Sequence, residues 1–375
     1  MKFLHLSDLH IGKKINDYSL KEDQRYVLTQ AKELAKNENV DAIVVAGDIY
    51  DSSVPTAEAS ELYDWFLSSF FELGKPILMV SGNHDSSERL HVASAILKRS
   101  GIYIATNVKE SIEPIKIAGV NFYLLPFFRP SEVNRAFGSE AKNYEDALKV
   151  VVENMAIERS ETNVIVAHQA FLPMDKKMEQ SGSETSLTID SSGYVGGTES
   201  ISVNVLSSFD YAALGHIHKA QNIASNARYA GALLKYHIDE ANAKRSFTVV
   251  SIDNKKVEIE EHPISSLHDL VILTGDIDEL LSRSGNENDY VYCKLTNESL
   301  VDSPMAKLKA KYPFCLGLEY PRTRVQSFER PDYEDVEEVD KNDLFATFFE
   351  NYGGRELEED ERKFVKELFE QEEGE

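Results

Sequence analysis

Five apolar runs of strand length in this 375-residue chain each end beside side chains of the kinds that bind metal ions. The runs read FLHLS, AIVVAG, ILMVSG, NVIVA and YAALG. The residues that follow them are Asp8 and His10, Asp48, Asn83, His168, and His216 and His218. Ligands of open α/β sheets collect at the carboxyl ends of the strands. We therefore predict that these seven side chains form one site that holds two metal ions.

The ligand types indicate which ions and which chemistry. Carboxylates and imidazoles without a thiolate suit manganese, iron or zinc. We expect Asp48 to bridge the two ions, because its strand should lie centrally in the sheet and Gly47 leaves room for the backbone. The ligands of one ion are then Asp8, His10 and His218, and those of the other are Asn83, His168 and His216. On an extended segment His216 and His218 would point to opposite faces and so reach different ions. Such a pair of ions can activate a water molecule and stabilise both the attacking and the leaving oxygen of a phosphoryl centre.

Other polar residues near these runs have two interpretations each. His84 is placed to act as a general acid for a leaving alcohol oxygen, or as a charge stabiliser. Asp51 and Asp85 either support the site or serve as ordinary cap and turn residues. The remaining histidines are expected to be surface residues or satisfied core residues, with His91 the nearest to an exception because it follows the His84 loop. These histidines are His5, His91, His237, His262 and His268.

Composition limits the classes of protein. With 42% hydrophobic and 28% charged residues, the chain can bury a full core, and its length predicts two or three domains. No apolar run approaches the roughly 18 residues that a membrane span needs. His5 and Asp8 interrupt any signal-peptide core, and Cys293 and Cys315 are too few for a disulfide framework. We expect two reduced core thiols in a cytoplasmic protein.

The formal net charge of −24 argues against nucleic-acid binding by this chain alone, since phosphate contacts depend on lysine and arginine. Residues 332–375 hold 18 acidic and 5 basic residues, so much of the negative charge lies in the tail. Metal ions would also neutralise the carboxylates of the site. DNA binding together with a partner that supplies a positive surface stays compatible with this charge.

Strand and helix patterns alternate over the first 160 residues, which predicts a layered α/β fold. We expect strands at 2–6, 42–46 and 77–80, a hairpin around Gly119, and helices at 21–37, after Pro55, at 88–98 and at 144–157. A loop rich in serine, glycine and threonine, 173–204, should be functional or mobile. A boundary near Pro263 precedes a smaller α/β unit with strands near 271–273 and 290–295 and a helix around 303–311.

The C-terminal segment is predicted to be an acidic linker followed by two short amphipathic helices. Their apolar residues are Leu344, Phe345, Phe348, Phe349 and Tyr352, then Phe364, Val365, Leu368 and Phe369. Two short helices cannot bury this many aromatic side chains between themselves. The exposed remainder should therefore meet another surface, on this chain or on a partner.

The ligand motifs resemble those of the calcineurin-like metallophosphoesterases. The motifs are Asp8-Leu-His10, Gly47-Asp48-Ile-Tyr-Asp51, Gly82-Asn-His-Asp85, Ala167-His168 and Gly215-His-Ile-His218. Segments 7–12, 209–218 and 231–236 are similar to one branch of that family, the nuclease (SbcD) subunits of SbcC–SbcD complexes. Ala220 and His237 depart from that branch, where proline and a small residue are usual. Neither position is a ligand, so the departures concern local loop geometry.

The resemblance implies a β-sandwich flanked by helices over 1–263, a small α/β capping domain over 264–328, and a linker with a C-terminal helix pair over 329–375. It implies a manganese-dependent nuclease that acts on DNA ends in repair, recombination and replication, with double-strand exonuclease and single-strand endonuclease activities. It also implies a partner, an SbcC-type coiled-coil ATPase that binds the helix pair, and a homodimer of the nuclease domain within a heterotetramer.

Two other functions stay open. A metallophosphodiesterase for small substrates would keep the ligands but leave residues 267–375 without a role. An inactive scaffold that only docks on an ATPase would not need the intact set of ligands.

Overall fold

The computed structural model describes residues 1–172, 194–195, 198–297, 299–320, 342, 345–346, 349, 355 and 357–372. The chain forms two compact units, Met1–Glu319 and Tyr320–Glu375. Most of the predicted loop 173–204 and the acidic linker 332–340 lie outside the described residues.

The first unit contains two six-stranded sheets. The first sheet has the order β18-β17-β1-β4-β5-β6, with four parallel strands and an antiparallel pair at one side. Its strands are β1 (Lys2–Leu6), β4 (Ala42–Ala46), β5 (Ile77–Val80), β6 (Ile102–Ala105), β17 (Ser246–Asp253) and β18 (Lys256–Pro263). As predicted, β4 lies inside the sheet, between β1 and β5.

The second sheet has the order β15-β16-β14-β9-β8-β7, and its four inner strands are parallel. Its strands are β7 (Ile115–Ile117), β8 (Val120–Leu125), β9 (Thr162–His168), β14 (Tyr211–Gly215), β15 (Gln221–Ala224) and β16 (Ala227–Tyr229). β7 and β8 form the predicted antiparallel hairpin around Gly119.

Alternating side chains of these strands divide between two sides of each sheet. In β4, Ala42, Val44 and Ala46 face the second sheet and share a core with Val164 and Val166 of β9. The other residues of the same strands contact helices. Because both faces of the inner strands β4 and β5 are buried, these two strands are apolar throughout. The layered β-sandwich flanked by helices is confirmed.

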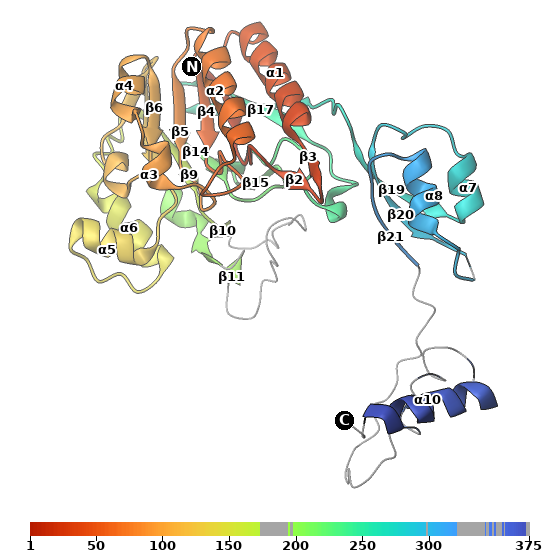
Figure 1. Ribbon diagram of the computed structural model, residues 1–375. Helices are drawn as coiled ribbons and strands as arrows, with labels where there is room; N and C mark the ends of the chain where they lie inside the picture. The colour runs from red at the N-terminus through yellow and green to blue at the C-terminus, as the bar shows by residue number, and fades with distance from the viewer. Residues whose placement is uncertain are drawn as a thin grey trace. The chain divides into compact units, whose positions relative to one another are not determined.

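Helices cover the outer face of each sheet. The helices α1 (Lys21–Asn37) and α2 (Ala57–Phe71) lie side by side against the first sheet (Figure 1). The helices α5 (Pro130–Phe137) and α6 (Tyr144–Asn154) contact the second. The predicted bounds of α1 are confirmed. α2 begins later than Pro55 predicts, because the Thr56 hydroxyl caps it by accepting from the Ala59 N–H at 3.2 Å.

The single helix predicted at 88–98 is wrong. Two short helices, α3 (Ser87–Leu90) and α4 (Ser94–Arg99), replace it. Ala93 separates them with a left-handed φ of 61°. No glycine or proline marks this break, so the apolar periodicity hides it.

A third, three-stranded sheet forms the smaller α/β unit. It comprises β19 (Leu270–Gly275), β20 (Tyr290–Leu295) and β21 (Cys315–Glu319), all parallel, with α7 (Ile277–Ser282) and α8 (Pro304–Lys311). Cys293 and Cys315 are buried here as free thiols, as expected. Asp23 of α1 ties this unit to the sandwich by accepting from the Tyr290 hydroxyl at 2.9 Å. The boundary near Pro263 stays a prediction.

The other described elements are short. They are β2 (Lys14–Ile15), β3 (Tyr18–Ser19), η1 (Val108–Ser111), β10 (Phe171–Leu172), β11 (Tyr194–Val195), β12 (Thr198–Glu199), β13 (Ile201–Ser202), η2 (Val203–Leu206) and η3 (Ile238–Glu240). Among the helices that the structure describes, none combines the length and apolar character needed to cross a lipid bilayer.

The second unit contains α10 (Glu359–Glu372), at the position of the second predicted amphipathic helix. The Phe345 ring contacts the rings of Phe349 and Phe369 at centroid distances of 6.4 and 6.2 Å. Phe364 and Leu368 stay 64% and 48% exposed. Leu344, Phe348 and Tyr352 lie outside the described residues.

Candidate metal centre

The seven predicted ligands lie at one edge of the sandwich, at the carboxyl ends of strands from both sheets. Asp8 and His10 follow β1, Asp48 follows β4, Asn83 follows β5, His168 ends β9, and His216 and His218 follow β14. Backbone hydrogen bonds hold the ligand loops together. The Asp8 N–H donates to Gly47 O at 3.1 Å, and the His10 N–H donates to Asp48 O at 3.0 Å. The His216 N–H donates to Asp8 Oδ1 at 3.0 Å, which joins the two sheets.

One group of donor atoms comes from Asp8, His10 and His218, whose atoms lie within 4.8 Å of one another. The Nε2 atoms of His10 and His218 are 3.1 Å apart. Asp48 Oδ2 lies 3.7 Å from His10 Nε2. These are the residues assigned from the sequence to one ion.

A second group of donor atoms comes from Asn83, His168 and His216. Asn83 Oδ1 is 3.1 Å from His168 Nε2 and 3.0 Å from His216 Nδ1. Asp48 Oδ2 is 3.3 Å from His168 Nε2. The Asp48 carboxylate therefore faces both groups, as a bridging ligand must.

The hydrogen bonds of His168 show why a cation fits this second group. Its Nδ1–H donates to Ala46 O at 2.8 Å, so in the neutral ring Nε2 presents a lone pair. That lone pair faces two acceptors, Asp48 Oδ2 and Asn83 Oδ1. Burial alone would lower the pKa of His168, but the Asp48 charge outweighs it and raises the pKa to about 9. Three acceptor atoms that converge in this way favour positive charge between them, and a divalent cation supplies it.

The pKa of the neighbouring His216 shifts in the opposite direction to that of His168. Burial, together with the charge of His168, lowers the pKa of His216 to about 3, so this ring stays neutral. A neutral imidazole is the form that binds metal. Asp48 stays ionised, because His168 and His10 outweigh its burial and hold its pKa well below the usual range.

The ligand backbone is unusual in a way that the sequence did not indicate. Asp8, His10, Asp48 and His216 have left-handed φ angles of 51°, 43°, 47° and 102°. Non-glycine residues rarely adopt such angles, and they cluster at functional sites. The extended segment expected for His216–His218 is therefore wrong. The two rings do reach different groups. A bend at His216 separates them, and not the alternation of side chains along a strand.

Two glycines allow the loops to approach one another. A Cβ atom on Gly47 would lie 2.3 Å from His168 Nδ1, and one on Gly82 would lie 2.1 Å from Asp48 Oδ1. Gly47 therefore gives the backbone room, as expected.

His84 lies at the accessible side of the site. Asn83 is exposed and His84 is partly exposed, whereas Asp8, Asp48 and His168 are buried. The His84 N–H donates to Asp48 Oδ1 at 3.0 Å, and the ring Nδ1–H donates to Asp51 O at 3.0 Å. Its ring centroid is 5.0 Å from that of His10. A ring nitrogen of His84 also lies within 4.8 Å of ligand atoms of His10 and Asp51.

The two supporting aspartates differ in what they contact. Asp51 Oδ1 lies 3.3 Å from His10 Nδ1 and 2.9 Å from Lys13 Nζ. Burial would raise the pKa of Asp51, but these two partners lower it to about 2. The Asp85 carboxylate accepts three backbone N–H bonds, from Ile49, Tyr50 and Gly82. It therefore fastens the loop after β4 to the loop after β5.

Sequence reasoning did not assign a role to Tyr236. Its ring centroid is 5.4 Å from that of His10 and 5.8 Å from that of His218. Its hydroxyl donates to Leu9 O at 2.8 Å. Only its place in the segment 231–236, quoted for its resemblance, marked this residue.

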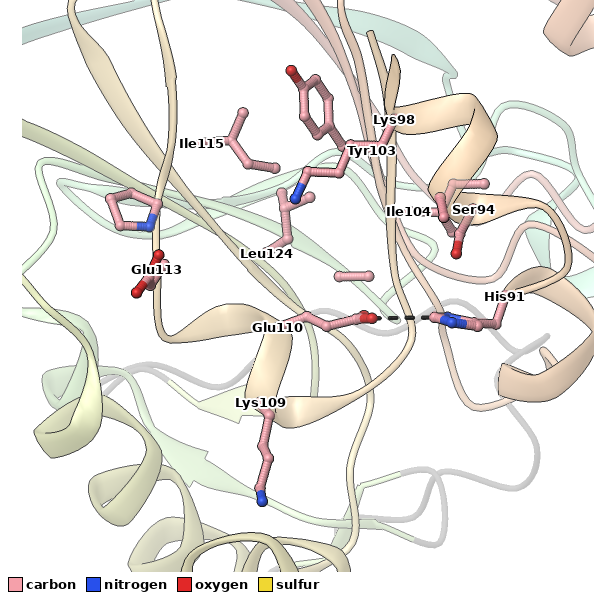
Figure 2. A pocket seen from close by; sticks show the side chains of 13 residues that line it. His91, Ser94, Lys98, Tyr103, Ile104, Lys109, Glu110, Glu113, Ile115 and Leu124 are labelled. Carbon is pink, nitrogen blue, oxygen red and sulfur yellow. Dashed lines mark ion pairs between the residues drawn. The ribbon is translucent and has the colours of Figure 1, made fainter. Parts of the chain in front are cut away.

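The other histidines contact partners away from the ligands. His5 is buried, with Nδ1 3.1 Å from the Tyr211 hydroxyl. His91 lines a cavity of about 510 Å³ between α4 and β7, where it faces Glu110 at 3.7 Å (Figure 2). His268 pairs with Asp23 at 3.0 Å, His262 lies 3.8 Å from Glu260, and His237 caps η3. Within the part of the chain that the structure describes, none of the five belongs to a metal-type cluster.

Comparison with known proteins gives a consistent result over the whole chain. Residues 1–220 match the family described as calcineurin-like phosphoesterase. Residues 266–352 match a family described as type 5 capsule protein repressor C-terminal domain. Two relatives are SbcD subunits of the nuclease SbcCD. The one from Staphylococcus epidermidis is 33% identical, with 98% of both chains covered. The one from Staphylococcus saprophyticus is 31% identical, with 98% of this chain and 97% of the relative covered.

A crystal structure of a dimetal phosphatase from Danio rerio is also similar, with a TM-score of 0.39 and 13% identity. The match covers 71% of this chain and 98% of that chain. A likeness of this size supports no statement about function.

Proposed function

Because the chain belongs to the calcineurin-like phosphoesterase family and, within it, to the SbcD components of SbcCD nucleases, we propose that it cuts DNA with two divalent metal ions. It is a metal-dependent phosphodiester hydrolase. The observation that carries the proposal is that two donor groups approach one carboxylate oxygen, Asp48 Oδ2, through His10 at 3.7 Å and through His168 at 3.3 Å.

The residues take the following roles. Asp8, His10 and His218 would hold one ion, Asn83, His168 and His216 would hold the other, and Asp48 would be a ligand shared by both. When bound, the ions supply a nucleophilic water and Lewis-acid stabilisation of the phosphoryl oxygens. Asp51 and Asp85 support the ligand loops, through His10 and through the backbone respectively.

His84 is the proposed general acid. Its Nδ1–H is engaged with Asp51 O, so the protonated ring presents a second N–H at Nε2. As the bond between phosphorus and the leaving oxygen breaks, this proton passes from Nε2 to that oxygen, which leaves as an alcohol. The neutral ring keeps its Nδ1–H and takes up a proton from solvent for the next turnover.

Manganese is the proposed metal, with magnesium, iron or zinc as the other candidates. The donor set contains carboxylates, an amide oxygen and imidazoles, and it suits these ions. The preference for manganese comes from the resemblance to the family.

A second protein completes the proposed enzyme. An SbcC-type coiled-coil ATPase would bind the C-terminal helix pair in 329–375, and the exposed Phe364 and Leu368 of α10 support this. That partner would also supply the positive surface for DNA that a net charge of −24 does not offer. The domains would then be the nuclease (1–263), the capping domain (264–328) and the partner-binding segment.

We further propose a homodimer of the nuclease domain, within a heterotetramer that acts in DNA repair, recombination and replication in the cytoplasm, near the nucleoid. Val92 and Ile96, beside and on α4, are 71% and 68% exposed, which supports contact between two copies.

The test uses end-labelled duplex DNA and circular single-stranded DNA, incubated with the purified chain with and without the ATPase partner, in manganese or magnesium. Metal-dependent shortening of the duplex and nicking of the circle are the expected exonuclease and endonuclease activities. A small bis-phosphodiester is assayed in parallel. Turnover of that compound without any cleavage of DNA would favour a small-substrate metallophosphodiesterase and overturn the proposal.

A further inference from the structure

A buried acid–base pair lies beside the ring of His218, at the nitrogen that does not face the other proposed ligands. Glu240 Oε1 is 3.7 Å from His218 Nδ1, and Glu240 Oε2 is 2.7 Å from Arg245 Nη2. We propose that Glu240, held by Arg245, is a positioning residue that orients His218 toward its metal ion. The inference rests on the proposed role of His218 as a ligand.

The Glu240 carboxylate is fixed from several directions. Its Oε2 accepts from the backbone N–H groups of Tyr236 and His237, and it forms an ion pair with Arg245 Nη2. The side chain of Glu240 has no exposed surface and that of Arg245 is 6% exposed. His237 and Glu240 form the capping box of η3, which fixes the residue to a rigid turn. A buried charge with this many partners has little freedom to move.

The same pair also holds the backbone of His218. Arg245 Nη1 donates to the carbonyl oxygen of His218. One guanidinium therefore fixes the main chain of the ligand and the carboxylate beside its ring. The Ala232 N–H donates to the same carbonyl oxygen at 3.0 Å, so the two donors together hold the main chain at His218.

The charge of Glu240 favours the tautomer of His218 that can bind a metal ion through Nε2. At 3.7 Å the contact is too long for a direct hydrogen bond, so the carboxylate acts through its field. In a buried place this field is weakly screened and favours the neutral tautomer that carries its hydrogen on Nδ1. The lone pair of the neutral ring then lies on Nε2, which faces His10 Nε2 at 3.1 Å.

The other imidazole of this group is arranged in the same way. Asp51 Oδ1 lies 3.3 Å from His10 Nδ1, and Lys13 holds Asp51 as Arg245 holds Glu240. His168, in the second group, uses the carbonyl of Ala46 instead. Partners of this kind behind metal-binding histidines contribute roughly 10- to 100-fold to metal affinity.

The test is a manganese titration of the full chain, followed by electron paramagnetic resonance, which separates a coupled ion pair from a single ion. Glu240→Gln should weaken binding of one ion by about 10- to 100-fold and leave a single-ion signal from the second group. The control, Glu261→Gln, breaks the 2.8 Å pair with Arg228 away from the ligands and should keep the coupled signal.

Glu240→Gln leaves Arg245 buried without its charge partner, which can unfold the chain. A double variant, Glu240→Gln with Arg245→Met, removes both charges and should show the same selective loss while folded. Wild-type affinity for both ions in either folded variant overturns the inference, as does an equal loss at both groups. A wild-type chain that binds no ion pair would instead overturn the proposed function.

Discussion

Substitution of Gly47 by alanine, compared with the same substitution at Gly101, distinguishes damage to the metal centre from backbone strain alone. The added Cβ would lie 2.3 Å from Nδ1 of His168, and the contact must lengthen by at least about 0.7 Å to reach the 3.0 Å that real Cβ atoms keep. His168 cannot give way freely, because it is fully buried and its Nδ1–H donates to Ala46 O at 2.8 Å. The ring must therefore lose that hydrogen bond or move its Nε2 away from Asp48.

The size of the effect follows from this displacement. A shift approaching 1 Å in a catalytic constellation costs on the order of 100-fold in rate. Separately, alanine at the φ of +86° found at Gly47 costs about 1–2 kcal/mol of folding free energy. Gly47→Ala should thus lose about 100-fold in phosphodiester hydrolysis and bind manganese more weakly.

Gly101 supplies the matched control. Its φ is +82°, and a Cβ there would meet nothing within 4 Å. Gly101→Ala should lower the free energy of unfolding, measured in urea, by the same 1–2 kcal/mol or so while keeping full activity and metal affinity. Wild-type activity in Gly47→Ala would refute the reasoning, and so would an equal loss of activity in Gly101→Ala.

Three further outcomes are expected. His84→Gln should keep both manganese ions but slow cleavage of end-labelled duplex by about 100- to 10,000-fold; unchanged cleavage would remove the acid role. Burial lowers the pKa of His5 to about 3 from 6.5, so between these pH values only the unfolded chain takes up a proton. The contribution of His5 to the free energy of unfolding is therefore complete above pH 6.5. It decreases as the pH drops below 6.5, by at most about 1.4 kcal/mol per pH unit. His5→Gln should flatten this slope in urea titrations from pH 4 to 7, and an unchanged slope would assign it to other groups. Phe348→Asp with Phe364→Asp should abolish binding of the ATPase partner in a pull-down and keep metal-dependent hydrolysis by the isolated chain. A loss of fold instead would mean that these rings contact the chain's own body.

The strands and the meeting of their ends followed from local pattern alone. An apolar run such as 42–46 predicts a strand that is buried on both faces of its sheet. A polar residue that directly follows such a run then lies at the carboxyl end of the strand. The sequence did not show that β9 and β14 belong to a different sheet from β1, β4 and β5, since that depends on pairing between distant strands.

Features set by tertiary contacts were not predictable. The helix break at Ala93 and the left-handed φ angles of Asp8 and His10 occur at residues other than glycine, so nothing in the sequence marks them. Glu240 and Tyr236 reach His218 through a loop whose path only the folded chain defines. Asp85 reads as a turn residue in the sequence, and its three backbone partners appear only when the two loops meet.

The left-handed backbone of Asp8, His10, Asp48 and His216 has an evolutionary consequence. Each such angle destabilises the native state by on the order of 1 kcal/mol, whether or not a cation is present, and glycine would relieve it. A population selected for heat resistance alone gains from replacing these residues wherever the relieved strain exceeds the hydrogen bonds lost, such as that from the His216 N–H to Asp8 Oδ1. Retention of the strained residues in a lineage is then a record that hydrolysis itself was under selection.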